Sequence, residues 1–193
     1  MVVSKSGIYT SPEDYLKSEE QSPIKHEYIR GEIYGMAGGS DAHDAISLNL
    51  LTLLKNHLRG SGCRAYTGNM KVYIELANVY YYPKAMVTCD ERDRKLQYFK
   101  QYPCLIIEVL SPSTEAFDRG GKFADYRLLE SLQEYVLVSQ ERMSVECFRR
   151  NPEGQWVLHP FGMADTVEFA SIGFRCEMAA LYEDVPDLMP SKQ

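Results

Sequence analysis

Long apolar runs are absent from this chain of 193 residues. The apolar stretch Cys104–Ile107, for example, is interrupted at Glu108, whereas a membrane-spanning helix needs about 20 apolar residues in succession. The segment Met1–Thr10 has neither the apolar centre nor the cleavage pattern of a secretory signal. We therefore expect a cytoplasmic protein that has no membrane partner.

A surplus of positive charge is also missing. Lysine and arginine number 21 against 27 aspartate and glutamate residues, so the formal net charge at pH 7 is −6. Proteins that bind nucleic acid through many phosphate contacts usually carry a basic surplus. The overall charge therefore argues mildly against nucleic-acid binding, although a local basic patch or a cleft between subunits could still provide it.

The sequence has no closely spaced cysteine pair and no recognisable nucleotide or hydrolase loop. Its five cysteines are scattered, so we expect neither a disulfide nor a thiolate zinc site, with Cys89 and Cys104 buried as small apolar side chains. The glycines at 35, 38 and 39 fit no phosphate-binding loop, and Ser111 and Ser113 lack the glycines of a nucleophile elbow. The other histidines show no metal-ligand spacing with His43.

What the chain does have is the composition of a globular protein, with 45% hydrophobic and 25% charged residues. No repeat or linker divides it, so we predict one domain over residues 1–185 and a short tail over 186–193. Apolar spacing and turn residues predict a mixed α/β (α+β) order with one sheet flanked by two major helices. Helices are expected at about 12–19, 41–59 and 118–129, a hairpin or bent strand pair at 27–36, and strands at 64–67, 72–76, 85–89, 104–110, 135–138, 145–148 and 156–159.

Glu108 is the most informative single residue. It interrupts the apolar strand Leu105–Leu110, and burying an unpaired carboxylate costs several kcal/mol. We therefore predict that Glu108 is more than half buried and lies within ion-pair or hydrogen-bond distance of Lys84 or Lys122. The alternative is a glutamate near a strand end that reaches solvent.

Lys122 and His43 are placed by their spacing on helix faces. Lys122 shares a side with Tyr126, so it could face the sheet near Glu108, or it could pair with Asp118 in solvent. His43 lies on the apolar stripe in the first turn of the long helix. A lone histidine there is more often a core residue than a ligand.

Several segments follow one another in an order that resembles a known family. They are Tyr81–Val87, Leu105–Thr114, Asp118–Tyr126 and Glu134–Val138, preceded by the opening block Glu27–Ala37 and His43. The run Glu-Val-Leu-Ser-Pro-Ser-Thr that starts at Glu108 is the most specific part. The chain resembles the Uma family of proposed restriction endonucleases, a branch of the PD-(D/E)XK nuclease superfamily, from about Tyr9 to Tyr182.

This resemblance implies a restriction-endonuclease-like fold, in which helices flank a central mixed sheet, and an endonuclease that hydrolyses DNA phosphodiesters with Mg²⁺ or Mn²⁺. In that superfamily an aspartate and a glutamate hold the metal while a lysine stabilises the transition state. Glu108 matches the strand glutamate, and the role of the lysine falls to Lys122 because the usual lysine position is Leu110 here. Glu32 matches an acidic residue of the opening block that would complete the metal site with Glu108.

Lys84 is the main departure from the family pattern. The family's metal-binding aspartate follows the proline after the tyrosines, and that position is Lys84 in this chain. An ammonium cannot ligate Mg²⁺, which takes oxygen ligands. If Lys84 points where the aspartate would, it places its charge against Glu108 and occupies the place of the metal.

We therefore expect an endonuclease-like protein with an altered metal site, whose candidate residues are Glu108, Lys122, Lys84, Glu32 and His43. Two alternatives stay open. One is a catalytically inactive member that acts as a nucleic-acid-binding or assembly module, and the other is an enzyme that uses Glu108 and Lys122 on another substrate without metal. A homodimer is also expected, because related nucleases pair two sites to cut two strands.

Overall fold

The computed structural model describes residues 9–185 and residue 188 of the chain. The tail predicted at 186–193 therefore lies, apart from Leu188, outside the described residues. Among the helices that are described, none has the length and apolar content needed to cross a membrane.

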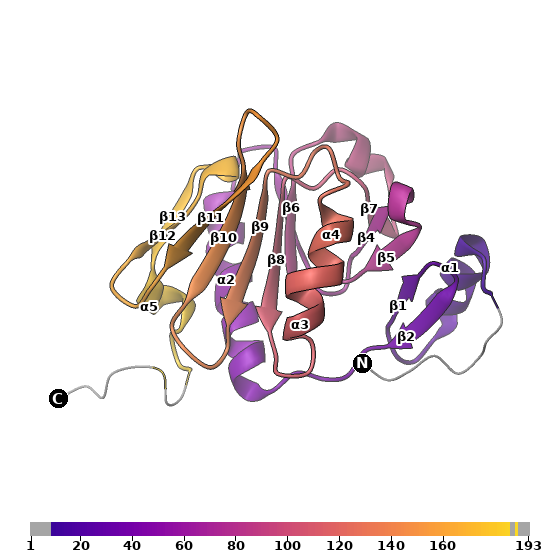
Figure 1. Ribbon diagram of the computed structural model, residues 1–193, viewed down its shortest axis with the longest axis horizontal. Helices are drawn as coiled ribbons and strands as arrows, with labels where there is room; N and C mark the ends of the chain where they lie inside the picture. Colours follow the sequence, from indigo (N-terminus) through magenta and orange to yellow (C-terminus); the bar gives the residue numbers. More distant parts are fainter. Residues whose placement is uncertain (1–8, 186–187, 189–193) are drawn as a thin grey trace.

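A six-stranded mixed sheet forms the centre of the molecule (Figure 1). Its order is β11-β10-β9-β8-β6-β3, in which β8 and β9 are parallel and the other neighbours antiparallel. The strands are β3 (Arg64–Thr67), β6 (Ala85–Thr88), β8 (Leu105–Leu110), β9 (Glu134–Ser139), β10 (Val145–Arg150) and β11 (Trp156–Phe161). The predicted mixed sheet is thus confirmed, with strand ends within two residues of those expected.

Two helical segments cover opposite faces of this sheet (Figure 1). One is α2 (Asp41–His57), whose apolar residues Ile46, Leu50 and Leu54 belong to the same buried cluster as Ile107 of β8. Ser40 caps this helix by accepting a hydrogen bond from the backbone N–H of His43 at 3.3 Å.

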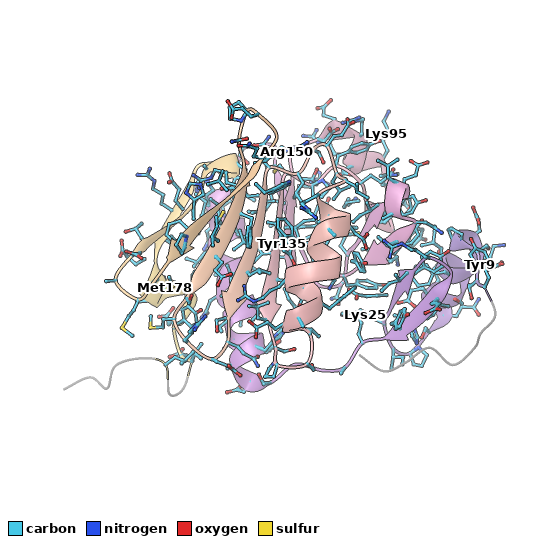
Figure 2. The ribbon with its side chains drawn as sticks, in the orientation of Figure 1. Tyr9, Lys25, Lys95, Tyr135, Arg150 and Met178 are labelled. Carbon is cyan, nitrogen blue, oxygen red and sulfur yellow. A yellow bond between two sulfur atoms is a disulfide. The ribbon has the colours of Figure 1, made fainter. Side chains whose placement is uncertain are left out.

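The second segment follows β8 and is a continuous helical run, α3 (Glu115–Phe117), η3 (Asp118–Lys122) and α4 (Phe123–Tyr126), of which η3 is a π-helical turn. It begins and ends about three residues earlier than the predicted helix at 118–129. Phe123 stacks on Tyr135 of β9 with ring centroids 4.9 Å apart, and the Tyr135 hydroxyl donates to the carbonyl of Asp118. Figure 2 labels Tyr135 beside this helical run. Because side chains alternate along a strand, β8 turns Ile107 to α2 and Glu108 to this helical run.

A second, five-stranded sheet of order β2-β1-β5-β4-β7 lies beside the first, so the prediction of a single sheet is corrected. Its strands are β1 (His26–Ile29), β2 (Glu32–Gly35), β4 (Lys71–Ile74), β5 (Val79–Tyr81) and β7 (Phe99–Lys100), and α1 (Pro12–Gln21) packs Tyr15 on it. Arg30 and Gly31 turn the β1–β2 hairpin with φ angles of 51° and 98°. Strands as short as β5 and β7 are too brief for an apolar alternation to reveal them.

The remaining described elements are short. They comprise the hairpin of β12 (Thr166–Phe169) and β13 (Phe174–Glu177), helix α5 (Met178–Leu181), and the 3₁₀ turns η1 (Glu75–Ala77), η2 (Glu91–Lys95) and η4 (Ala170–Ile172). The hairpin and α5 contribute Val167, Phe169, Phe174, Met178 and Leu181 to the buried cluster that α2 forms with the central sheet.

A disulfide joins Cys63 to Cys89, so the expectation of no disulfide is wrong. Strands β3 and β6 pair antiparallel with Arg64 opposite Thr88, which brings the next residues outward, Cys63 and Cys89, face to face. The two cysteines are 26 residues apart in the chain, and this spacing alone does not predict that they meet across two strands. Cys89 is exposed rather than buried, whereas Cys104 is buried as predicted, with its sulfur 3.9 Å from that of Cys89.

Candidate active site

A cavity of about 290 Å³ lies where the two sheets, α2 and the helical run meet. Its walls include the site candidates Glu108, Lys122, Lys84 and His43, together with Glu27 and Asp118, which the sequence had not singled out. Glu32 is not among the lining residues. A volume near 300 Å³ is at the lower end for pockets that bind small ligands.

Glu108 is 3% exposed, so its predicted burial is confirmed. Its Oε1 accepts a hydrogen bond from the Tyr126 hydroxyl at 3.2 Å and contacts the Lys122 Nζ at 3.1 Å. Its Oε2 accepts the backbone N–H of Lys84 at 3.3 Å. The predicted partner is therefore present, and it is Lys122.

Lys122 is surrounded by three carboxylates. Its Nζ lies 3.0 Å from Glu27 Oε1, 3.1 Å from Glu108 Oε1 and 3.5 Å from Asp118 Oδ1. Lys122 therefore faces the sheet, as the first of the two interpretations expected. It does pair with Asp118, but within a buried group and not in solvent.

The π-helical turn η3 carries both Asp118 and Lys122. The sequence signal for this irregular turn is the pair Gly120-Gly121. A Cβ on Gly121 would lie 2.8 Å from the ring of Phe117, so only glycine lets that ring pack here. Wider turns of this kind inside helices occur often at functional sites.

Burial and the mutual charges shift the pKa values of this cluster. Burial raises the pKa of Glu108 to about 7, and Lys122 offsets only part of that effect. Burial also raises the pKa of Asp118. Burial by itself would lower the pKa of the Lys122 ammonium, but Glu108, Glu27 and Asp118 together raise it well above its ordinary value. Lys122 is therefore a permanent cation at neutral pH, and Glu108 is the group that exchanges a proton there.

Lys84 does not make the ion pair with Glu108 that the sequence suggested. It lines the cavity, but among the described residues the ammonium that contacts Glu108 is that of Lys122, and Lys84 offers only its backbone N–H. The physical reason is that Lys122 reaches Glu108 from the helical run packed directly over β8, where it is also held by Glu27 and Asp118.

His43 lies on another wall of the cavity, at the first turn of α2. It is 7% exposed, and within the described part of the chain neither ring nitrogen makes a hydrogen bond. Burial and the nearby charge of Lys84 lower the pKa of His43 to about 4, so the imidazole is neutral at pH 7.

The structure places Glu32 away from the other candidates. It is exposed at the start of β2 and accepts a hydrogen bond from the Tyr34 hydroxyl. Glu27 of β1 takes the position expected for Glu32: it is 8% exposed, and its Oε1 accepts the backbone N–H of Tyr82 at 3.1 Å besides contacting Lys122. The structure thus brings Glu27, and not the expected Glu32, to Glu108 and Lys122.

A divalent cation does not fit these side chains as they are arranged. Among the described residues, no group of three or more histidine, cysteine, aspartate or glutamate side chains is placed to hold a metal ion. The carboxylates of Glu27, Glu108 and Asp118 contact the Lys122 ammonium, and Lys84 adds a second ammonium to the cavity. This donor set matches an ammonium and not Mg²⁺, which requires oxygen ligands on all sides.

Comparison with protein families gives a match over most of the chain. A family model described as "Uma2: Putative restriction endonuclease" matches residues 12–179. The chain is 45% identical to the uncharacterized protein slr1290 of Synechocystis sp. over 172 residues, which cover 89% of this chain and 90% of the relative. It is 37% identical to the uncharacterized protein sll1609 of the same organism over 160 residues, or 82% of this chain and 90% of the relative.

A solved structure shares the fold. The crystal structure of "a putative nuclease belonging to DUF820" from Anabaena variabilis superposes with a TM-score of 0.72, covering 90% of this chain and 97% of that one. The sequence identity is 17%, so this likeness concerns the fold alone. The predicted mixed α/β architecture, in which helices flank a mixed sheet, is thereby confirmed.

Proposed function

Because the chain belongs to the Uma2 family, whose description is "Putative restriction endonuclease", we propose that it binds nucleic acid at this cavity but does not cut it with a divalent metal ion. The proposal combines the family's nuclease fold with a metal site altered at Lys84. The observation that carries it is the position of the Lys122 Nζ, 3.0, 3.1 and 3.5 Å from carboxylate oxygens of Glu27, Glu108 and Asp118.

Metal-dependent phosphodiester hydrolysis needs free carboxylate oxygens. The metal activates the attacking water and neutralises the charge of the phosphate, and acidic side chains hold it in place. In this cavity the ammonium of Lys122 occupies the space between those side chains and neutralises part of their charge. The resemblance of the sequence places Lys84 where the family has a metal-binding aspartate. Neither ammonium can activate water as a metal does.

Binding of a nucleic-acid strand is supported by the groups at the mouth of the cavity. The residues Ser111, Ser113 and Thr114, which follow the end of β8, line this cavity, as does Lys84. Hydroxyl and ammonium groups are common donors to phosphate oxygens. The net charge of −6 restricts binding to this local region, so we expect weak affinity with a shallow salt dependence, because few phosphates meet a lysine there.

Cleavage is tested with supercoiled plasmid in millimolar Mg²⁺ or Mn²⁺. We expect the natural chain to nick no faster than Glu108→Gln, because neither protein assembles a metal site. Lys84→Asp restores a carboxylate at the metal position and is the variant expected to gain activity. Metal-dependent nicking by the natural chain that Glu108→Gln abolishes would overturn the non-cleaving part of the proposal.

Binding is tested by fluorescence anisotropy with labelled single-stranded and duplex DNA over a series of salt concentrations. Lys84→Met should weaken binding and reduce by about one the number of counterions released, as measured from the slope of log affinity against log salt concentration. Lys55→Met is the matched control, since Lys55 is exposed in the last turn of α2, far from the cavity. Absence of binding even at low salt would refute the nucleic-acid part.

A further inference from the structure

Both ring nitrogens of His43 are buried, and in the described part of the chain neither makes a hydrogen bond of ordinary geometry, although the side chain of Gln140 lies near the ring. A buried polar atom without a partner costs about 1–3 kcal/mol, so such atoms are rare unless a ligand satisfies them. The imidazole is only 7% exposed and belongs to the lining of the cavity. Gly39 makes room for it, since a Cβ there would lie 2.6 Å from the ring.

Two sources of positive potential lie beside this ring. Lys84 lines the same cavity, and its charge is close enough to depress the pKa of His43. The amino end of α2, a helix of 17 residues, presents backbone N–H groups that have no partner within the helix. Asp41 and Asp44 in the first turn are exposed and weaken the helix contribution, so Lys84 supplies most of the charge.

We propose that His43 and Lys84 form a phosphodiester-binding subsite at the amino end of α2, in which Lys84 supplies the positive charge that a metal ion supplies in related sites. His43 donates a directional hydrogen bond from its neutral ring to one phosphate oxygen. This subsite rests on the proposed function and deepens it, because it names the group of the nucleic acid that is bound and the residues that bind it. It also gives Lys84 a role other than blocking a metal.

The charge of the cavity favours a monoanion over a dianion. The opposite wall holds the carboxylates of Glu27, Glu108 and Asp118, which the ammonium of Lys122 only partly neutralises. An internal phosphodiester carries one negative charge, whereas a terminal phosphate carries nearly two at neutral pH. A strand bound through an internal phosphate therefore meets less repulsion than a phosphorylated end.

The test compares two probes of equal length, a thymidine hexanucleotide and a hexamer of the abasic sugar–phosphate backbone. Both should bind the natural chain with similar affinity, equally in EDTA and in millimolar Mg²⁺. His43→Phe, which keeps the ring but removes both nitrogens, and Lys84→Met should each weaken both probes on the order of tenfold. The controls His57→Phe and Lys55→Met, at the far end of α2, should change nothing, and thermal unfolding checks that every variant is folded.

Three results would overturn the subsite: hexamer affinity unchanged in both His43→Phe and Lys84→Met, binding of the thymidine probe without binding of the abasic one, or affinity that requires Mg²⁺. If both variants bind the hexamers and DNA as tightly as the natural chain does, the subsite is refuted but the proposed binding of nucleic acid is not. If no nucleic acid binds, dimethyl phosphate decides the subsite separately. It should shift the His43 ring signals in NMR spectra of the natural chain but not of Lys84→Met, and no shift would refute the subsite.

Discussion

Replacing Glu108 by glutamine should remove the pH-dependent contribution of the Glu108 carboxyl to the free energy of unfolding and leave the opposite contribution of His43. The pKa of Glu108 is about 7 in the folded protein because the side chain is buried, against an ordinary value of 4.5. Between these values the folded state binds the proton more tightly than the unfolded state. The stability that this proton contributes is therefore complete below about pH 4.5 and is lost as the pH rises through about 7.

The size of this contribution follows from the two pKa values. At 1.36 kcal/mol for each pKa unit, the gap corresponds to about 3 kcal/mol of unfolding free energy. His43 acts in the opposite direction, because its pKa falls from 6.5 to about 4 on folding and its contribution is lost as the pH falls. The slopes of Glu108 and His43 therefore oppose each other between about pH 4.5 and 6.5, and the raised pKa of Asp118 adds to the loss of stability with rising pH.

The assay is urea unfolding of the natural chain, Glu108→Gln and the exposed control Glu141→Gln over a range from about pH 4.5 to 8. The unfolding free energy of the natural chain minus that of Glu108→Gln should fall by about 3 kcal/mol across this range. Replacing His43 by phenylalanine in the Glu108→Gln background should remove the gain in stability that His43 contributes as the pH rises to about 6.5. A difference that does not change with pH would refute the argument, since it would mean that Glu108 titrates normally.

Other expected outcomes concern the ion-pair cluster, the metal position, the disulfide and the assembly. Lys122→Met should lower the unfolding free energy by about 3–5 kcal/mol, because it leaves buried carboxylates without a cation, while Lys55→Met serves as the near-neutral control in the same urea assay. Thermal unfolding of Lys84→Asp should shift upward with millimolar Mg²⁺ much more than that of the natural chain, and an equal shift in both would contradict the altered-site hypothesis. Reduction of the Cys63–Cys89 disulfide, which closes a loop of 26 residues, should cost about 3 kcal/mol, and the reductant should have no effect on Cys63→Ser. We also predict a homodimer, which light scattering would contradict by giving a monomer mass at every concentration.

Glu108 and Lys122 could be predicted because each breaks a local pattern. A carboxylate inside an apolar strand demands a partner wherever the strand is buried, and a lysine on the sheet-facing side of the next helix is within reach. The structure confirms both the burial and the ion pair. The architecture could be predicted for a different reason: in a long segment such as α2, the regular spacing of apolar residues shows which face is buried.

Glu27 could not be distinguished from Glu32 by local pattern. Both lie in one short hairpin, and only the docking of β1 against the helical run decides which carboxylate meets Lys122. One signal was available: Glu27 precedes Tyr28, which packs on the opposite face with Tyr15, so strand alternation turns Glu27 the other way. The Cys63–Cys89 disulfide was not predicted for a related reason: the register that pairs β3 with β6 is a property of the sheet and cannot be read from spacing along the chain.

The contacts of Lys122 also set the order in which the site can be assembled. Glu108, Asp118 and Lys122 are neighbours in the chain and meet as soon as β8 and its helical run pack together. Glu27 belongs to β1 of the other sheet, so its contact with Lys122 joins two residues that are far apart in the chain. We expect this contact to form later, because contacts between distant residues cost more chain entropy and form more slowly. A chain whose N-terminal strands have opened thus keeps its central sheet but has no complete cavity, so slow hydrogen exchange in β1 reports an intact site.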